Sequence, residues 1–397
     1  MLLEEPARKT PVIGEYGTAV VGGGIAGIAA ALAAARNGAK TLLIEKQFAL
    51  GGLATLGLVT IYLPLCDGCG RQVSFGIAEE LLRLSIRHGF EDKYPVPWLE
   101  NGTLEARRKQ RFEVQYNASI FAVLCEQLLR ENGVEILYGT SVCGVQVERQ
   151  KIRALFLENK SGRSAVRVCA VADCTGDADL CTMSGADTAL FGQGNVVAAW
   201  YYAQHGDRVR LKMLGFADVP DKYKSDREKT EKRRRYGGLN GAELSEMTQE
   251  AHRALLADFL KDGGVSPRHS LTAMASVPQV RMTRRLSGAY TMDDTERHRY
   301  FADSIGMVGD WRRAGPVYEI PFRTLYSEKV KNLAAAGRCI SVTDDMWDVT
   351  RVIPACAVTG QAAGTALALT DDLPALDPAA LQARLLRDGV RLHGGEV

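Results

Sequence analysis

A glycine-rich segment near the start of the chain constrains the fold more strongly than any other feature. Residues 18–21, two of which are valine, lead directly into Gly22, Gly24 and Gly27, with the spacing Gly-x-Gly-x-x-Gly. An Ala-rich helical stretch follows, and an apolar second strand is expected at residues 41–44. Strand, glycine turn, helix and strand in this order predict a βαβ unit of the Rossmann type, which binds a dinucleotide.

Each part of this unit has a mechanical role. Gly22 permits the tight turn, Gly24 lets the backbone approach a pyrophosphate, and Gly27 lets the helix pack closely on the strand. Ile25 and Ala26 belong to the first turn of the helix, whose free N–H groups and partial positive charge attract an anion.

An acidic residue closes the second strand. Glu45 follows residues 41–44 directly, and a carboxylate there accepts hydrogen bonds from a ribose hydroxyl and repels a 2′-phosphate. Lys46, the next residue, is assigned to the same site. The unit therefore favours the adenosine half of a cofactor that carries no 2′-phosphate.

Four further segments extend the predicted nucleotide site. The first comes just after the second strand, the next two follow strand-like runs at 166–172 and 332–336, and the last is interpreted as the start of an Ala-rich helix that faces an anion. Separated turns of this kind suit a long cofactor wrapped by a domain assembled from distant segments, and a nicotinamide dinucleotide rarely needs so many. FAD is therefore the predicted cofactor. The residues are Gly51, Gly52, Leu53, Ala54 and Thr55; Thr175, Gly176 and Asp177; Gly337 and Arg338; and Gly360, Gln361 and Ala362.

Short stretches along the chain form an ordered set with these turns. They are GGLATLGLV (51–59), RFEVQYNASIFAVLCEQLL (111–129), ENKSGR (158–163), DCTGDADL (173–180), VRMTRRLSGAY (280–290), DSIGMVGDW (303–311) and YEIPFRTLY (318–326). The set resembles the bacterial FAD-dependent oxidoreductase family, which is distantly similar to fumarate reductase flavoproteins, heterodisulfide reductase flavin subunits and tRNA-uridine-modifying flavoproteins. Between Ser341 and Arg351 the family often carries a histidine, whereas this chain has VTDDMWDVT.

The resemblance implies an α/β fold class: a Rossmann-like, glutathione-reductase-like FAD-binding domain with an inserted α+β substrate domain. We expect a discontinuous FAD-binding domain at 14–192 and 325–375, a substrate or cap domain at 193–324, and a C-terminal helix and tail at 376–397. Within the inserted segment, residues 243–262 have the apolar spacing of a helix.

Arginines are the main candidates for catalysis. Arg281 and Arg284 lie in a strand-like segment that resembles the family's arginine-rich motif, and their spacing places them on opposite faces of an extended chain. Arg351 precedes the helix expected to meet the flavin, where a guanidinium would hold the negative charge of reduced flavin or clamp a substrate carboxylate. An ordinary ion pair is the alternative for each. His205 follows the aromatic run WYYAQ and is a candidate to face the substrate, although a lone histidine is more often structural.

Charge and composition weigh against other classes of function. The chain has 49 basic and 47 acidic residues, a net charge of +2, so no overall field attracts nucleic acid or an acidic membrane. Basic residues cluster at 222–235, but interleaved acids favour a solvated segment over a nucleic-acid site. No apolar run reaches the length that spans a bilayer.

The cysteines and histidines bear on the redox compartment and on metal binding. Nine cysteines, an odd number without a repeating frame, favour reduced thiols in the cytoplasm. Cys66 and Cys69 have the spacing of a redox dithiol but do not follow the Gly51-Gly52 turn directly, so we interpret them as loop thiols. The six histidines show no pair at metal-ligand spacing, so no metal site is predicted.

Together these features predict an FAD-dependent oxidoreductase, of dehydrogenase or ene-reductase type, that moves a hydride between a small organic substrate and flavin N5. A flavin-bearing electron-transfer subunit of a larger redox complex is one alternative, although the chain lacks a cysteine run for an iron–sulfur cluster. A tRNA-modifying flavoprotein is another. The expected partner is a small-molecule substrate and not a membrane, and assembly into a homo-oligomer is left open.

Overall fold

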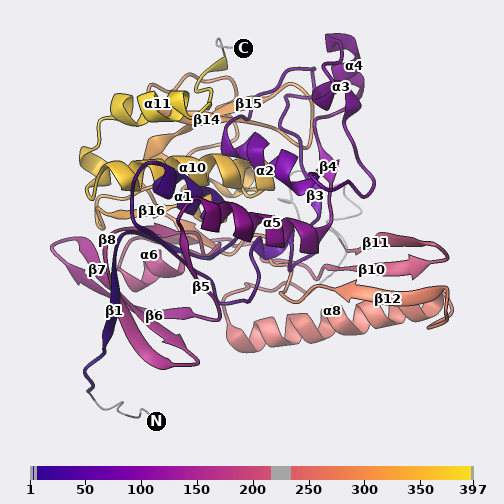
Figure 1. The fold of residues 1–397 in the computed structure, drawn as a ribbon, viewed down its shortest axis with the longest axis horizontal. Coiled ribbons are helices and arrows are strands. Elements are labelled where there is room, and N and C mark those ends of the chain that lie inside the picture. Colours follow the sequence, from indigo (N-terminus) through magenta and orange to yellow (C-terminus); the bar gives the residue numbers. More distant parts are fainter. Residues whose placement is uncertain (1–2, 4–6, 216–233, 395–397) are drawn as a thin grey trace.

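The computed structural model describes residue 3 and residues 7–215 and 234–394. It has the predicted α/β architecture, with a main body and a smaller unit that extends from it (Figure 1). The predicted basic segment at 222–235 lies mostly outside the described residues; of its arginines the structure describes Arg234 and Arg235, and Arg234 pairs with Glu246.

A seven-stranded sheet forms the centre of the main body. Its strand order is β5-β2-β1-β8-β7-β6, and β16 pairs with β8 beside this path. The pairs β1–β2, β1–β8, β2–β5 and β8–β16 are parallel, whereas β6, β7 and β8 form an antiparallel meander. The parallel part is the Rossmann-like unit that the glycine motif predicted. The strands are β1 (Val12–Val21), β2 (Thr41–Ile44), β5 (Glu135–Leu137), β6 (Ser141–Glu148), β7 (Lys151–Asn159), β8 (Gly162–Asp173) and β16 (Leu333–Ala335).

Two Ala-rich helices, α1 (Ile25–Arg36) and α10 (Ile353–Leu369), pack against each other beside this sheet. Small residues allow the contact, since a Cβ added at Gly360 would lie 2.3 Å from the carbonyl oxygen of Ala26. The prediction that a helix starts at Gly360 is therefore wrong. The helix begins at Ile353. Gly360 lies in its interior, at a point where close packing on α1 leaves no room for a side chain.

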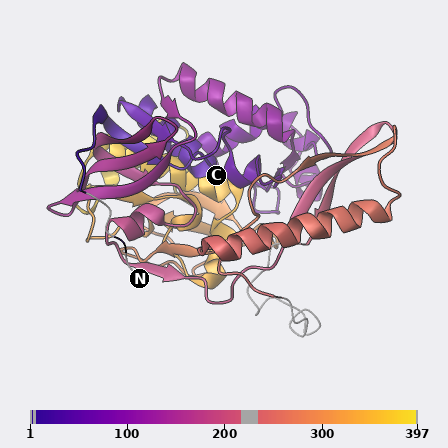
Figure 2. The same ribbon diagram turned by 90° about the horizontal axis from the view of Figure 1, so that it is seen from below.

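The extending unit is a three-stranded antiparallel sheet backed by one long helix (Figure 2). The sheet has the order β11-β10-β12, from β10 (Ala199–His205), β11 (Arg208–Leu214) and β12 (His269–Met274). The helix is α8 (Gly241–Lys261), so the helix predicted at 243–262 is confirmed. Apolar side chains of β10 and α8 form the core between the two layers, namely Ala199, Tyr201, Ala203, Leu255 and Phe259.

The predicted substrate or cap domain at 193–324 includes two strands that pack elsewhere. Strands β14 (Ser304–Gly309) and β15 (Val317–Pro321) pair with each other, and their buried residues Ile305 and Tyr318 share one core with α1 and α10. This pair therefore packs with the main body and not with the β10–β12 sheet. The division into domains otherwise stays a prediction.

The remaining elements surround these layers. Helix α11 (Pro378–Arg387), with Asp377 as its N-cap, lies in the segment where a C-terminal helix was predicted. No single helix in the described ranges is long and apolar enough to cross a membrane; α9 (Asp344–Thr350) and α10 reach that length only together, across a bend of 90°. The other helices are α2 (Ile77–Ser85), α3 (Val96–Leu99), α4 (Leu104–Lys109), α5 (Ala118–Glu131), α6 (Asp179–Met183) and α9 (Asp344–Thr350), and the other strands are β3 (Ile61–Tyr62), β4 (Val114–Gln115), β9 (Thr188–Leu190) and β13 (Arg284–Leu286).

Candidate functional site

The three motif glycines differ in what surrounds them. Gly22 has a φ of +98°, and a Cβ there would lie 2.4 Å from the carbonyl oxygen of Cys174. A Cβ at Gly27 would lie 1.8 Å from the carbonyl oxygen of Gly22. At Gly24, the N-cap of α1, a Cβ would meet nothing within 4 Å. Packing therefore requires Gly22 and Gly27, whereas Gly24 borders open space at the helix N-terminus, where an anion is favoured.

Glu45 closes β2 against the glycine turn. Its side chain is buried; Oε2 accepts a hydrogen bond from the Gly23 amide at 2.6 Å and Oε1 accepts one from the Gln47 amide at 2.7 Å. A carboxylate has about four acceptor positions, so two stay available for ribose hydroxyls. Gly23 was not among the predicted residues, and its position between Gly22 and Gly24 was the available signal. Lys46, next to Glu45, is exposed.

The Gly51-Gly52 turn docks directly on the glycine turn. The Gly51 amide donates to the carbonyl oxygen of Gly23 at 2.8 Å, and a Cβ at Gly52 would lie 3.3 Å from the Cα of Gly24. The following residues form a short 3-10 turn, in which the carbonyl oxygen of Ala54 accepts from the hydroxyl of Tyr116 at 2.8 Å. Leu53 lies within that turn, and Thr55 ends it and donates to the carbonyl oxygen of Leu50.

The turn after β8 and the turn after β16 meet at one place. The Nε of Arg338 donates to the carbonyl oxygen of Gly176 at 2.7 Å, and its Nη2 pairs with Asp177 at 2.9 Å. The fully buried Asp173 orders the first turn, because its Oδ1 accepts from the amide of Thr175 at 3.1 Å and from its hydroxyl at 2.7 Å. Asp173 directly follows the strand-like run predicted at 166–172 but was not among the predicted site residues.

Contact with α1 joins these turns to the first glycine motif. A Cβ at Gly337 would lie 2.7 Å from the Cβ of Ala26, in the first turn of α1. The segments predicted from distant parts of the sequence thus converge around the N-terminus of α1. Gly360, Gln361 and Ala362 form no turn of their own but are buried inside α10. Gly360 packs on Ala26, and Gln361 accepts a hydrogen bond from the amide of Ile77 at 2.8 Å.

Arg284 holds the backbone of the turn after β8. Its Nε donates to the carbonyl oxygen of Asp177 at 2.8 Å, and its Nη2 pairs with Asp179 at 2.8 Å. Burial, together with the charges of Asp177 and Asp173, raises the pKa of Asp179 against the opposing effect of Arg284. These contacts give Arg284 a positioning role.

Arg281 lies in a different environment. It is 5% exposed, its guanidinium lies 5.3 Å from the ring centre of Trp200, and its Nε has no hydrogen-bond partner in the described part of the chain. Burial, together with the positive charges of Arg351 and Arg338, lowers the pKa of Arg281 to about 9, with Asp348 acting in the opposite direction. Positive charges thus gather close to the turns that converge on α1.

Arg351 and Asp348 form a buried ion pair at the end of α9. Asp348 is fully buried, and Arg312 contributes a second cation at 3.7 Å from its Oδ2. The Nε of Arg351 has no hydrogen-bond partner among the described residues. Asp348 belongs to the stretch that departs from the family pattern, and sequence reasoning did not single it out.

His205 does not join this cluster. It ends β10, in the extending unit, and its ring lies 4.7 Å from the ring of His269. None of its contacts involves a predicted nucleotide-site residue or one of the candidate arginines. The structure therefore separates His205 from the other candidates, because the strand runs away from the main body (Figure 1).

The cysteines form no bond with one another. All nine are free thiols. Cys66 is buried, and burial raises the pKa of its thiol, whereas Cys69 is exposed. A buried thiol with a raised pKa is a poor nucleophile, which agrees with the interpretation of this pair as loop thiols.

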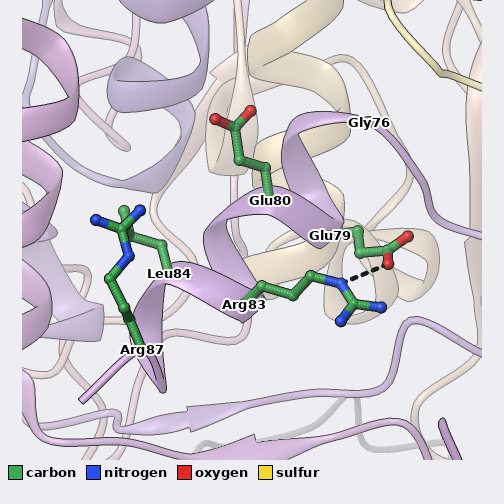
Figure 3. Close-up of a pocket in the computed structure, with 6 residues that line it drawn as sticks. All are labelled: Gly76, Glu79, Glu80, Arg83, Leu84 and Arg87. Atoms are coloured by element: carbon green, nitrogen blue, oxygen red, sulfur yellow. Dashed lines mark hydrogen bonds and ion pairs between the residues drawn. The ribbon is translucent and has the colours of Figure 1, made fainter. Parts of the chain in front are cut away.

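A surface hollow of about 370 Å³ opens along α2 (Figure 3). Glu79 pairs with Arg83 at 2.7 Å, and Glu80 pairs with Arg36 of α1 at 2.7 Å. These partly exposed pairs make a solvated helix face, and no predicted nucleotide-site residue lines it. The lining residues are Gly76, Glu79, Glu80, Arg83, Leu84 and Arg87.

Comparison with known proteins identifies the family. A sequence model described as FAD dependent oxidoreductase matches residues 18–236 and 195–385. The chain belongs to the FAD-dependent oxidoreductase family. Thioredoxin reductase from Ureaplasma parvum serovar 3 is 34% identical over 71 residues, which are 18% of this chain and 23% of that protein, so the aligned stretch spans less than a quarter of that relative.

Solved structures similar to this FAD-dependent oxidoreductase include proteins of several kinds. A geranylgeranyl bacteriochlorophyll reductase-like protein from Thermoplasma acidophilum is 14% identical, with a TM-score of 0.46 over 94% of this chain and 86% of that chain. CabE, an aromatic hydroxylase from angucycline biosynthesis, is 13% identical, with a TM-score of 0.46 over 95% of this chain and 65% of that chain. The flavin-dependent brominase Bmp2 is 13% identical, with a TM-score of 0.47 over 94% of this chain and 84% of that chain.

FAD is the cofactor of this family, and the residues present fit it. The open space beside Gly24 leaves room for a pyrophosphate against the N-terminus of α1. Glu45 keeps acceptor positions for a ribose. Two buried guanidiniums, those of Arg281 and Arg351, each have an Nε without a protein partner in the described ranges and so suit an anionic group.

Proposed function

We propose that this FAD-dependent oxidoreductase acts on a small organic substrate that carries a carboxylate, with Arg281 as its principal binding residue. Bound FAD supplies hydride transfer at flavin N5. The observation that carries the proposal is the burial of Arg281 beside two other arginines without a carboxylate of its own.

The three neighbouring arginines differ in whether a carboxylate of the protein pairs with them. Arg338 pairs with Asp177 and Arg351 pairs with Asp348, whereas no carboxylate in the described residues forms an ion pair with Arg281. A buried charge is costly unless it is paired, so a site of this kind is completed by an anion from outside the chain. A guanidinium presents parallel N–H donors that match the two oxygens of a carboxylate.

The lowered pKa of Arg281 agrees with a binding role. Burial and the charges of Arg351 and Arg338 lower this pKa to about 9, and a bound carboxylate would offset that shift. The direction of hydride transfer, in reduction of an activated C=C bond or oxidation of an alcohol or amine, stays a prediction. The electron-transfer and tRNA-modifying alternatives stay predictions.

The test is anaerobic titration of the FAD-loaded enzyme with matched pairs of small molecules, each a carboxylate and its uncharged amide. The visible absorbance of the flavin reports electron transfer in either direction. We expect carboxylates to react and their amides to react at least tenfold more slowly, with the difference abolished in Arg281→Met. Equal reaction of both members of each pair, or an unchanged preference in Arg281→Met, would contradict the proposal.

A further inference from the structure

The outer end of the extending unit brings together three metal-ligating side chains from three elements. His205 ends β10, His269 begins β12, and Asp262 is the C-cap of α8. One ligand atom from each lies within 4.8 Å of the other two. Sequence spacing could not reveal this group, because antiparallel pairing places His205 directly opposite His269.

We propose that His205, His269 and Asp262 bind one divalent transition-metal ion, for which Zn²⁺ is the natural probe. Two imidazoles and one carboxylate suit Zn²⁺ and related first-row ions, whereas Ca²⁺ and Mg²⁺ prefer oxygen ligands alone. Bonds of about 2.1 Å in a tetrahedral site hold ligand atoms about 3.4 Å apart. Small side-chain rotations would close the present arrangement around an ion, and water would complete the coordination.

The surroundings of the two histidine rings favour metal binding. The Nδ1 of His269 contacts the carbonyl oxygen of Gly264 at 2.5 Å, so Nδ1 carries the proton and Nε2 presents a lone pair. Its ring also stacks on Phe259, with ring centres 4.6 Å apart and an angle of 5° between the planes. The Nε2 atoms of His205 and His269 are both buried without a hydrogen-bond partner in the described part of the chain. A buried nitrogen of this kind is costly unless a ligand satisfies it.

One neighbour competes with a metal ion. Lys212 of β11 pairs with Oδ2 of Asp262 at 2.9 Å, and its side chain is 38% exposed. The second carboxylate oxygen stays available to an ion, and the long lysine side chain can move into solvent. A bound ion would join the end of α8 to both outer ends of the β10–β12 pair. This role is structural and is independent of the proposed redox function.

The experiment is titration of the FAD-loaded protein, freed of metal and of any histidine tag, with Zn²⁺ by isothermal calorimetry. We expect one Zn²⁺ per chain, no binding of Mg²⁺ and an unchanged flavin spectrum. His205→Gln, His269→Gln and Asp262→Asn should each weaken binding at least about tenfold. Lys212→Met should tighten it, because the competing cation is removed.

The matched control is His252→Gln, which removes an exposed histidine of α8 outside the cluster. Retained FAD shows that each variant is folded. If a histidine variant fails to fold, Asp262→Asn decides the result, because Asp262 is exposed. The proposal is overturned if Zn²⁺ does not bind, if the ligand variants bind as the wild type does, or if His252→Gln loses binding equally.

Discussion

Replacing Arg281 by methionine is expected to make the protein more stable while impairing its recognition of an anionic substrate. Burial, together with the positive charges of Arg351 and Arg338, lowers the pKa of Arg281 to about 9, well below the ordinary value of an arginine. That difference corresponds to about 5 kcal/mol by which folding disfavours the charged form. The contact with Trp200, at 5.3 Å, returns about 2 kcal/mol of this as a cation–π interaction. The remainder agrees with the roughly 1–4 kcal/mol gained when buried charges are replaced by apolar residues.

The pH dependence follows from the direction of the shift. Below pH 9 the guanidinium is protonated in both the folded and the unfolded chain, so the whole cost is present at pH 7. Above about pH 9, and up to the higher pKa of the unfolded chain, only the unfolded chain holds the proton, and the stability of the wild type rises with pH. Arg281→Met should lack this rise.

The assay is urea unfolding at pH 7 of protein with and without FAD, followed by circular dichroism. Without FAD, Arg281→Met should raise the free energy of unfolding by roughly 1–3 kcal/mol. The matched control is Arg284→Met, three residues away, which breaks two satisfied contacts and should lower that free energy by roughly 1.5–3 kcal/mol. If both variants are destabilised to the same extent, Arg281 is paired like an ordinary structural arginine and the reasoning is refuted.

Substitutions at four further positions test the cofactor site and the packing around it. Glu45→Ala should weaken FAD binding by roughly 1.5–3 kcal/mol, measured by flavin release on dilution, because it removes a charge-assisted acceptor. Gly24→Val should keep the fold but lose FAD, since nothing in the protein opposes a side chain there; a full flavin complement would show that the motif is misplaced. Gly360→Val should instead lower the thermal unfolding midpoint, because its Cβ would lie 2.3 Å from a carbonyl oxygen of α1. Arg351→Ala should shift the flavin midpoint potential to a more negative value in spectroelectrochemistry, and Arg351→Lys should recover part of the shift; an unchanged potential would reduce Arg351 to the partner of Asp348.

Local features of the sequence determined the Rossmann-like unit and most of the nucleotide turns. Gly27 packs on Gly22 and Gly24 caps the helix within one βαβ unit, so most of the pattern carries its own geometry, and Gly22 packs in addition on Cys174. Helix α8 could be predicted from apolar spacing, and α11 from its N-cap and first-turn proline, because these signals act within a few residues.

Tertiary structure alone decided how charged and small residues are used. The sequence around Gly360 resembles a helix start, but Gly360 is a packing residue because α1 lies against it. Two features depend on segments that approach only after folding: the burial of Arg281 without an ion pair to a described carboxylate, and the pairing of Arg351 with Asp348. In the sequence His205 is a lone histidine, and only strand pairing places His269 opposite to it. Sequence periodicity reports which face of an element is apolar, whereas the charge, burial and ligand-binding capacity of a side chain are set by neighbours that are far away in the chain.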